Sequence, residues 1–381
     1  MPPSFTIQTI GILGGGQLGR MMALAAKSMG FRIVVLDPEE DCPCAQVADK
    51  QILADYSNEI ACRELLQACD VITYEFENVP VTSARILEGK LPQGSRLLEI
   101  TQDRLREKES VRNLGFLTAD YLPIRNPEEL EAFVRQFLQN PRKVFLKTAR
   151  GGYDGKGQYV LRSAADLQEF RNEHYQPELT YVAETAFNFD MELSAIVCRN
   201  ARGECSVFPV AENIHRNQIL YQSIVPARVP EQIHLKAKDL ALKMAEGLQL
   251  QGTLAIELFL CGDELRVNEL APRPHNSGHY SLDACLTSQF EQHIRAVCNL
   301  PLGDARQVSP CVMLNLLGED MEKLSREKVG KHKLHLYGKK KARTGRKMGH
   351  INILENNLEE CILSLDSIST NETKISKPEI H

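Results

Sequence analysis

The chain has 381 residues, of which 43% are hydrophobic and 25% charged, as in a soluble globular protein with two or three domains. The formal net charge of -5 argues against nucleic acid as a partner, and no apolar run approaches the roughly 20 residues that span a bilayer. The first residues, MPPSFTIQT, lack a basic region and a long apolar region, so we do not expect secretion. The 11 scattered cysteines without a C-x-x-C pair favour reduced thiols in the cytoplasm.

The first hundred residues alternate between strand and helix patterns. Runs rich in β-branched residues predict strands at residues 10–13, 32–37, 51–55 and 70–76. Apolar residues at helical spacing predict helices at 17–29 and 58–69. This order predicts an N-terminal α/β domain over residues 1–100, built on a doubly wound parallel sheet. The charged segment 101–115, which opens with Thr101 as a capping residue, predicts a helix that leads out of the domain.

The order of the elements changes after residue 117, where an α+β pattern begins. It predicts helices at 127–138, 164–174 and 232–248, and strands at 144–149, 158–163, 180–186, 191–199, 253–260 and 264–271. The last two strands flank the sequence CGDE, a hairpin signal. We therefore expect antiparallel sheets in a second domain, 101–300. Strand patterns at 311–318, 333–338 and 349–354 predict a small β-rich domain over 301–365, followed by a frayed polar tail, 366–381.

A lysine followed by a glycine-rich loop is the clearest functional motif. Lys147 ends an apolar run and opens the sequence KTARGGYDGKGQ, whose glycines allow backbone N–H groups to approach phosphate oxygens. The spacing differs from a Walker loop, in which the lysine ends the glycine run. Two later acids, Glu257 and Glu269, are ligands of the kind that Mg2+ prefers. Together these residues predict a site for a nucleoside triphosphate.

A second glycine motif lies near the start of the chain. Gly14, Gly16 and Gly19 form G-x-G-x-x-G between a strand and a helix, and Asp37 ends the next strand. The pattern fits a dinucleotide or the phosphate of a mononucleotide, and it also fits a tight turn without a ligand; we favour a phosphate. The segment YEFENV contains two acids, Glu75 and Glu77. Either one of them accepts hydrogen bonds from sugar hydroxyls, or the segment is a solvated loop.

Three further features have two interpretations each. Glu184 and Glu192 flank a linker between strands, where they are either ligands of a nucleotide or ordinary surface acids. His215 is a lone histidine, which usually is not a ligand. The basic tract YGKKKARTGRKMGH is either a solvated hairpin tip or an electropositive cover over an anionic ligand.

Taken together, the motifs resemble those of a known family. GGGQLGRM, YEFENV, KTARGGYDGKGQ, NELAPRPHNSGH and GRKMGH occur in this order over nearly the whole chain, as far as Asn352. This ordered set resembles the ATP-grasp superfamily and, within it, the N5-carboxyaminoimidazole ribonucleotide synthetases, ATP-dependent carboxylases of purine biosynthesis. The resemblance implies an ATP-grasp fold with a mobile lid subdomain, ATP and Mg2+ as cofactors, and 5-aminoimidazole ribonucleotide and bicarbonate as substrates. It also implies a cytoplasmic homodimer that hands its product to a mutase.

The resemblance implies roles for individual residues. The catalytic residues would be Lys147, Tyr153, Asp154 and Arg273. The ATP site would comprise Arg104, Lys147, Gly152, Tyr153, Asp154, Gly155, Lys156, Gly157, Gln158, Glu184, Thr185, Ala186, Phe187, Glu192, His215, Asn268 and Glu269. Glu257 and Glu269 would hold the metal. The ribonucleotide and bicarbonate would contact Gly16, Gln17, Glu75, Asp154, Arg273, His275, Asn276, Lys339 and Arg346.

The implied reaction is a carboxylation through carboxyphosphate, under a glycine loop that closes and excludes water. Three alternatives stay open. Another ATP-grasp ligase, such as a formate-dependent glycinamide ribonucleotide transformylase, would share the ATP site. An NAD-dependent oxidoreductase explains the first glycine motif but leaves Glu257 and Glu269 without a role. A non-catalytic nucleotide-binding regulator is disfavoured by the intact Lys147, Glu257 and Glu269.

Overall fold

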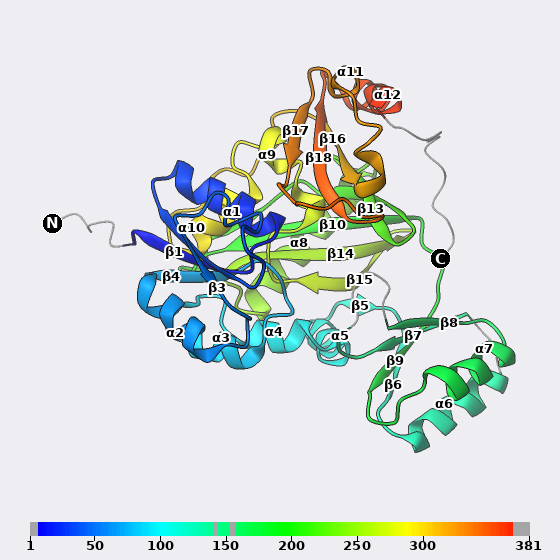
Figure 1. Cartoon of the computed structure of the whole chain (residues 1–381). Helices are drawn as coiled ribbons and strands as arrows, with labels where there is room; N and C mark the ends of the chain where they lie inside the picture. The colour runs from blue at the N-terminus through cyan, green and yellow to red at the C-terminus, as the bar shows by residue number, and fades with distance from the viewer. Residues whose placement is uncertain (1–6, 140–142, 152–156, 369–381) are drawn as a thin grey trace.

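The computed structural model describes residues 7–139, 143–151 and 157–368 (Figure 1). Three sheets organise them: a four-stranded parallel sheet, a ten-stranded central sheet and a second four-stranded sheet. In Figure 1 the parallel sheet is blue, at the left, and the smaller antiparallel sheet is at the lower right. The central sheet lies between and above them. Among the described helices, none has the length and apolarity needed to cross a membrane.

The N-terminal sheet confirms the predicted parallel, doubly wound arrangement. Its strands, in spatial order, are β3 (Lys50–Leu53), β2 (Arg32–Asp37), β1 (Thr9–Leu13) and β4 (Val71–Tyr74). Alternate residues face opposite sides: Ile10 and Ile12 pack with α1 (Gln17–Ser28), whereas Leu13 packs with α2 (Glu59–Ala68). Helix α3 (Val81–Leu87) and the short turn η1 (Glu88–Lys90) follow β4. The fold class of this region therefore follows from the local pattern.

The predicted helix at 101–115 is instead two helices. Helix α4 (Arg96–Thr101) ends at the residue expected to cap a new helix, and α5 (Arg104–Asn113) begins three residues later. Asp103 is the N-cap of α5, because its carboxylate accepts the N–H groups of Leu105 and Arg106. This break directs the first residue of α5 toward the interior of the molecule.

The second four-stranded sheet forms an outer subdomain over residues 121–185. Its order is β6 (Tyr121–Ile124), β9 (Tyr181–Thr185), β7 (Val144–Thr148) and β8 (Gln158–Leu161), all antiparallel. Helix α6 (Pro127–Gln139) and α7 (Ala164–Glu169) cover the sheet through a common apolar core. The helix predicted at 164–174 is α7 followed by a π-helical turn, Phe170–His174.

The central sheet unites the predicted second and third domains. Its main path runs β17-β18-β16-β13-β12-β10-β14-β15-β5, with β11 paired to β10. The strands are β5 (Leu117–Thr118), β10 (Met191–Arg199), β11 (Cys205–Val207), β12 (Ala211–Arg216), β13 (Ile219–Val225), β14 (Gly252–Cys261), β15 (Glu264–Ala271), β16 (Cys311–Leu317), β17 (Lys333–Leu336) and β18 (Lys347–Leu354). The predicted β14–β15 hairpin is confirmed. Because β16 pairs with β13, the strands of the predicted C-terminal domain extend the central sheet.

Helices cover both faces of the central sheet. The remaining helical elements are α8 (Glu231–Gly247), η3 (Asn276–Gly278), α9 (Ser281–Ala284), α10 (Gln289–Val297), η4 (Gly318–Asp320), α11 (Arg326–Val329) and α12 (Leu358–Ile368). Helix α12 extends three residues into the segment expected to be a frayed tail, and Ile368 is buried in the core that β16 and β18 share. Residues 369–381 lie outside the described part of the chain.

Candidate active site

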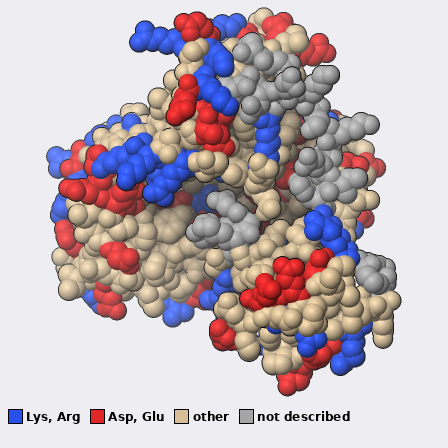
Figure 2. Space-filling model, turned by 45° about the vertical axis from the view of Figure 1, so that its right-hand side comes forward, with Lys and Arg blue, Asp and Glu red and all other residues tan. Residues whose placement is uncertain are grey.

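A cavity of about 760 Å3 opens where the three sheets meet. Figure 2 shows this face, with Lys and Arg atoms in the hollow beside the outer subdomain. All the predicted site residues in the described part of the chain line the cavity, except Gly16 and Gly157. Five others, Gly152, Tyr153, Asp154, Gly155 and Lys156, lie outside the described residues, as does the expected closure of their loop.

Ion pairs hold Lys147 in the part of the cavity beside β7 and β9, which we call the nucleotide end because the resemblance implies ATP there. Lys147, on β7, donates to one oxygen of Glu184 on β9 at 2.9 Å, because the two strands are adjacent. Lys108 of α5 lies 3.1 Å from the other oxygen. Burial alone would raise the pKa of Glu184, but the two lysines lower it to about 2. Sequence patterns did not single out Lys108, which belongs to a strongly charged helix.

An apolar surface continues the cavity beyond β9. Thr185, Ala186 and Phe187, the residues that the resemblance assigns to an adenine pocket, line it. The rings of Phe187 and Phe189 lie 5.5 and 4.5 Å from that of Phe259, centre to centre. Phe259 was missed, although it lies two residues after Glu257 and therefore faces the same side of β14. The aromatic cluster suits the face of a planar base.

A second, partly buried acid pairs with the lone histidine. Nδ1 of His215 on β12 is 2.7 Å from a carboxylate oxygen of Glu192 on β10. Burial tends to lower the pKa of His215, but Glu192 raises it above the ordinary value. Both residues line the cavity, so a surface position for Glu192 is excluded.

The two acids expected to hold a metal lie directly opposite each other. Glu257 of β14 pairs in register with Glu269 of β15, and a β-bulge follows this pair. Adjacent residues of a regular strand face opposite sides, yet the bulge allows both Asn268 and Glu269 to line the cavity. Nδ2 of Asn268 reaches Glu257 at 3.4 Å, and Nη1 of Arg104 lies 3.5 Å from Glu269.

This pair of acids fits a divalent cation. Burial, followed by the charge of Glu269, raises the pKa of Glu257 to about 7. A cation between the two carboxylates would remove this repulsion, and their oxygens are the ligands that Mg2+ prefers. The residues present therefore fit the predicted metal at Glu257 and Glu269.

The first glycine motif has its N–H groups occupied by the protein itself. Gly15 donates to Asp37 at 2.6 Å, whereas Gly16 and Gly19 donate to the two oxygens of Glu75, Gly19 at 2.7 Å. The N–H of Gly16 thus binds Glu75 in place of an external phosphate, while Gln17 faces the cavity. Asp37, the acid that a dinucleotide ribose would need, is buried in these contacts. The turn therefore offers little support for an NAD site.

The wall beyond β15 carries the predicted substrate residues. Arg273 forms an ion pair with Glu77, the acid that the sequence left as an alternative to Glu75. Nδ1 of His275 accepts the N–H of Ser277, so Nε2 carries the proton and faces Glu257 at 3.4 Å. Burial and the nearby Arg273 lower the pKa of His275 well below its ordinary value. This histidine is therefore a neutral donor next to the acidic pair.

Asn276 is held by a partner from the central sheet. Its side-chain amide exchanges hydrogen bonds of 2.9 and 2.7 Å with Asn315 of β16. This pairing fixes its orientation at the edge of the cavity.

The basic tract joins the cavity from the C-terminal strands. The connection between β17 and β18 brings Lys339 and Arg346 to the cavity wall, together with Lys347, which the sequence did not single out. Burial and the charge of Arg346 lower the pKa of Lys339 to about 8. Lys340 is exposed, and it donates to the backbone of Glu40 at 2.9 Å. The tract thus contacts the N-terminal domain.

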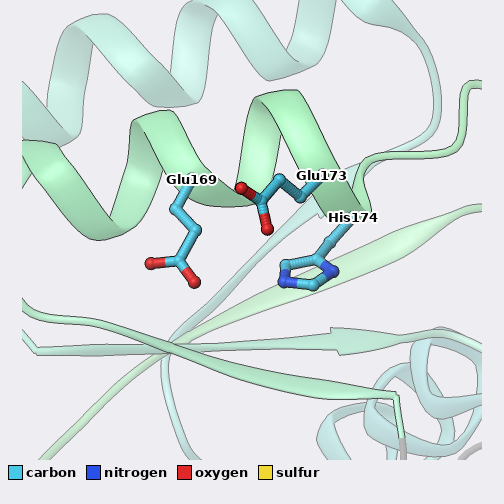
Figure 3. A group of neighbouring side chains, drawn as sticks. All are labelled: Glu169, Glu173 and His174. Carbon is cyan, nitrogen blue, oxygen red and sulfur yellow. The ribbon is translucent and has the colours of Figure 1, made fainter.

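Another group of possible metal ligands lies on the outer subdomain. Glu169, Glu173 and His174 gather along one side of α7 and its π-helical turn (Figure 3). Both acids are exposed. Exposed acids of this kind are common without a metal, and we assign no role to them.

Comparison with known proteins agrees with this architecture. The chain matches family models described as a ribonucleotide synthetase preATP-grasp domain at residues 7–102, an ATP-grasp domain at 109–290 and a phosphoribosylaminoimidazole carboxylase C-terminal domain at 311–363. The fold and the cavity between its sheets therefore define an ATP-grasp protein.

The relatives define the family more narrowly. The N5-carboxyaminoimidazole ribonucleotide synthase of Bacillus subtilis is 51% identical over 360 residues, 93% of each chain. A crystal structure of an N5-carboxyaminoimidazole ribonucleotide synthetase with ADP is 50% identical, with a TM-score of 0.89, covering 95% of this chain and 96% of that one. The Aspergillus clavatus enzyme with ADP and 5-aminoimidazole ribonucleotide is 29% identical, with a TM-score of 0.86, covering 96% and 98%. The chain belongs to the N5-carboxyaminoimidazole ribonucleotide synthase family.

Proposed function

We propose that this protein is an ATP-dependent carboxylase of 5-aminoimidazole ribonucleotide. The reaction consumes ATP and bicarbonate and yields N5-carboxyaminoimidazole ribonucleotide, ADP and phosphate. The observation that carries the proposal is a single cavity lined by Lys147 of β7 and by Lys339 and Arg346 from the connection between β17 and β18, with Glu257 and Glu269 also on its wall. Such a cavity suits a nucleoside triphosphate and a second phosphorylated substrate together.

The residues divide the chemistry between binding and charge stabilisation. The aromatic cluster holds adenine, and Lys147 and Arg104 bind phosphate oxygens. Glu257 and Glu269, with Asn268 beside them, hold Mg2+, which when bound neutralises the charge of the transferring phosphoryl group. Arg273 and His275 also line the cavity, where they orient bicarbonate and the amine.

The bonds change in two steps. A bicarbonate oxygen attacks the γ-phosphorus, the bond to ADP breaks, and carboxyphosphate forms. The exocyclic amine of the ribonucleotide then attacks the carboxyl carbon, inorganic phosphate leaves, and the nitrogen loses a proton. Exclusion of water matters because carboxyphosphate hydrolyses; the resemblance assigns that role to the glycine loop with Tyr153 and Asp154. We further propose that the protein is a cytoplasmic homodimer and that it passes its product to a mutase.

The test is release of ADP, measured with and without each substrate. We expect release that depends on both 5-aminoimidazole ribonucleotide and bicarbonate. Stimulation by glycinamide ribonucleotide and formate instead would identify a transformylase. A fluorescence titration with NADH checks the oxidoreductase alternative, and saturable binding would revive it.

A further inference from the structure

The carboxylate of Glu184 is shared by two lysines of different position. Lys147 lines the cavity and contacts one oxygen at 2.9 Å. Lys108 contacts the other oxygen at 3.1 Å from behind, with 3% of its side chain exposed, against 15% for Lys147. Glu184 itself is 6% exposed. One buried negative charge thus has two positive partners, only one of which reaches the ligand space.

This arrangement bears on how Lys147 becomes available to a ligand. Its ammonium group must turn from Glu184 toward a phosphate if it is to bind one. A buried carboxylate that loses its only cation is strongly destabilised. If Lys147 were the only partner of Glu184, this free-energy cost would oppose its movement toward a phosphate. Lys108 keeps the carboxylate paired when Lys147 moves.

We propose that Lys108 is a positioning residue that neutralises Glu184 and so frees Lys147 for the nucleotide phosphates. The inference rests on the proposed use of ATP. Helix α5 supports it, because Arg104 and Lys108 lie one turn apart and each contacts a carboxylate that lines the cavity. The helix therefore presents two cations to the site, one at its wall and one behind it.

The test measures binding of ADP with Mg2+, and of adenosine, by calorimetry. Lys108→Met should weaken ADP binding about tenfold or more, because Lys147 then stays with Glu184. Adenosine lacks phosphate, so its affinity should change less than about twofold. Adding Glu184→Gln to Lys108→Met should restore most of the lost ADP affinity, because an uncharged amide no longer retains Lys147.

Controls separate this role from a structural one. Arg106→Met removes an exposed cation from the same helix and should leave ADP binding unchanged. Equal loss of ADP and adenosine binding, or no rescue by Glu184→Gln, would overturn the inference while leaving the proposed function intact. A wild-type protein that binds no ADP would overturn both. If Lys108→Met does not fold, Lys108→Gln takes its place in the same comparison.

Discussion

Two parts of the cavity were predicted to bind anions, and they achieve this differently. At the glycine turn of α1, the backbone N–H groups of Gly16 and Gly19 hold the carboxylate of Glu75. At the nucleotide end, the ammonium groups of Lys147 and Lys108 hold the carboxylate of Glu184. Each place therefore already contains an anion that belongs to the protein.

The pKa values of these two carboxylates shift in opposite directions. Burial raises the pKa of Glu75 above its ordinary value, and the N–H groups of Gly19 and Gly16 only partly offset this effect. The pKa of Glu184 falls to about 2, because two full positive charges outweigh a similar burial. A helix N-terminus supplies a weak partial charge, whereas a lysine pair supplies a strong one. An external phosphate must therefore compete with Glu75 for weak partial charges at one place, and with Glu184 for two lysines at the other.

The largest effect should come from the acid pair Glu257 and Glu269, which needs a cation, whereas Glu75 at the glycine turn does not. Glu269→Gln should reduce ATP turnover at least about 100-fold, because the transferring phosphoryl group loses its counter-ion. Its side chain is 45% exposed, so the unfolding midpoint should hardly move. The measurement is ADP release at saturating Mg2+. Glu264→Gln, on the same strand and outside the cavity lining, is the control; near-normal turnover in Glu269→Gln would contradict the metal assignment.

The next effect sharpens the role of the glycine turn. A Cβ atom on Gly16 would lie 2.5 Å from Oε1 of Glu75, so Gly16→Ala must displace that carboxylate. We expect KM for 5-aminoimidazole ribonucleotide to rise about tenfold and KM for ATP to stay within about twofold. Steady-state kinetics with each substrate varied in turn gives both values.

Gly89→Ala is the matched control, because a Cβ atom there meets nothing within 4 Å. A selective loss of ATP binding in Gly16→Ala would move the turn from the ribonucleotide to the nucleotide cofactor. Both anion-binding places would then serve the nucleotide.

A smaller effect is expected at the basic tract between β17 and β18. Arg346→Lys should weaken binding of 5-aminoimidazole ribonucleotide about five- to tenfold, because a lysine cannot grip phosphate through two parallel hydrogen bonds. Titration in the presence of ADP measures it. Lys341→Ala should change little, and Lys340→Ala should act through its contacts with Glu40 and Asp41. Equal small effects from all three would show that the tract is solvated surface.

The smallest effect is a difference in pH dependence. Glu184 has a folded pKa of about 2, below its ordinary value of 4.5, so its stabilising contribution is present above pH 4.5 and is lost as the pH falls toward 2. Glu75 has a raised folded pKa, so its contribution is present below its ordinary value of 4.5 and is lost as the pH rises through the folded pKa.

Urea midpoints of the wild type, Glu184→Gln and Glu75→Gln between pH 3 and 7 test this contrast. The advantage of the wild type over Glu184→Gln should shrink toward low pH, whereas its advantage over Glu75→Gln should shrink toward high pH. If both differences in urea midpoint change with pH in the same direction, the two carboxylates lie in similar electrostatic environments.

The parallel N-terminal sheet, the β14–β15 hairpin and the family could be predicted from the sequence, because alternation, helical spacing and ordered motifs are local features. The sequence also identified most residues of the cavity wall through those motifs. It did not reveal that β16 pairs with β13 or that α5 begins only after Asp103.

Which side chains contact each other depends on how distant segments pack. Glu75 accepts the N–H of Gly16, which lies 59 residues away in the sequence. Lys108 of α5 contacts Glu184 of β9. The bulge that turns both Asn268 and Glu269 into the cavity leaves no mark in the alternation of β15. Hydrogen bonds and ion pairs between distant segments depend on how sheets and helices pack, and local periodicity carries no information about that packing.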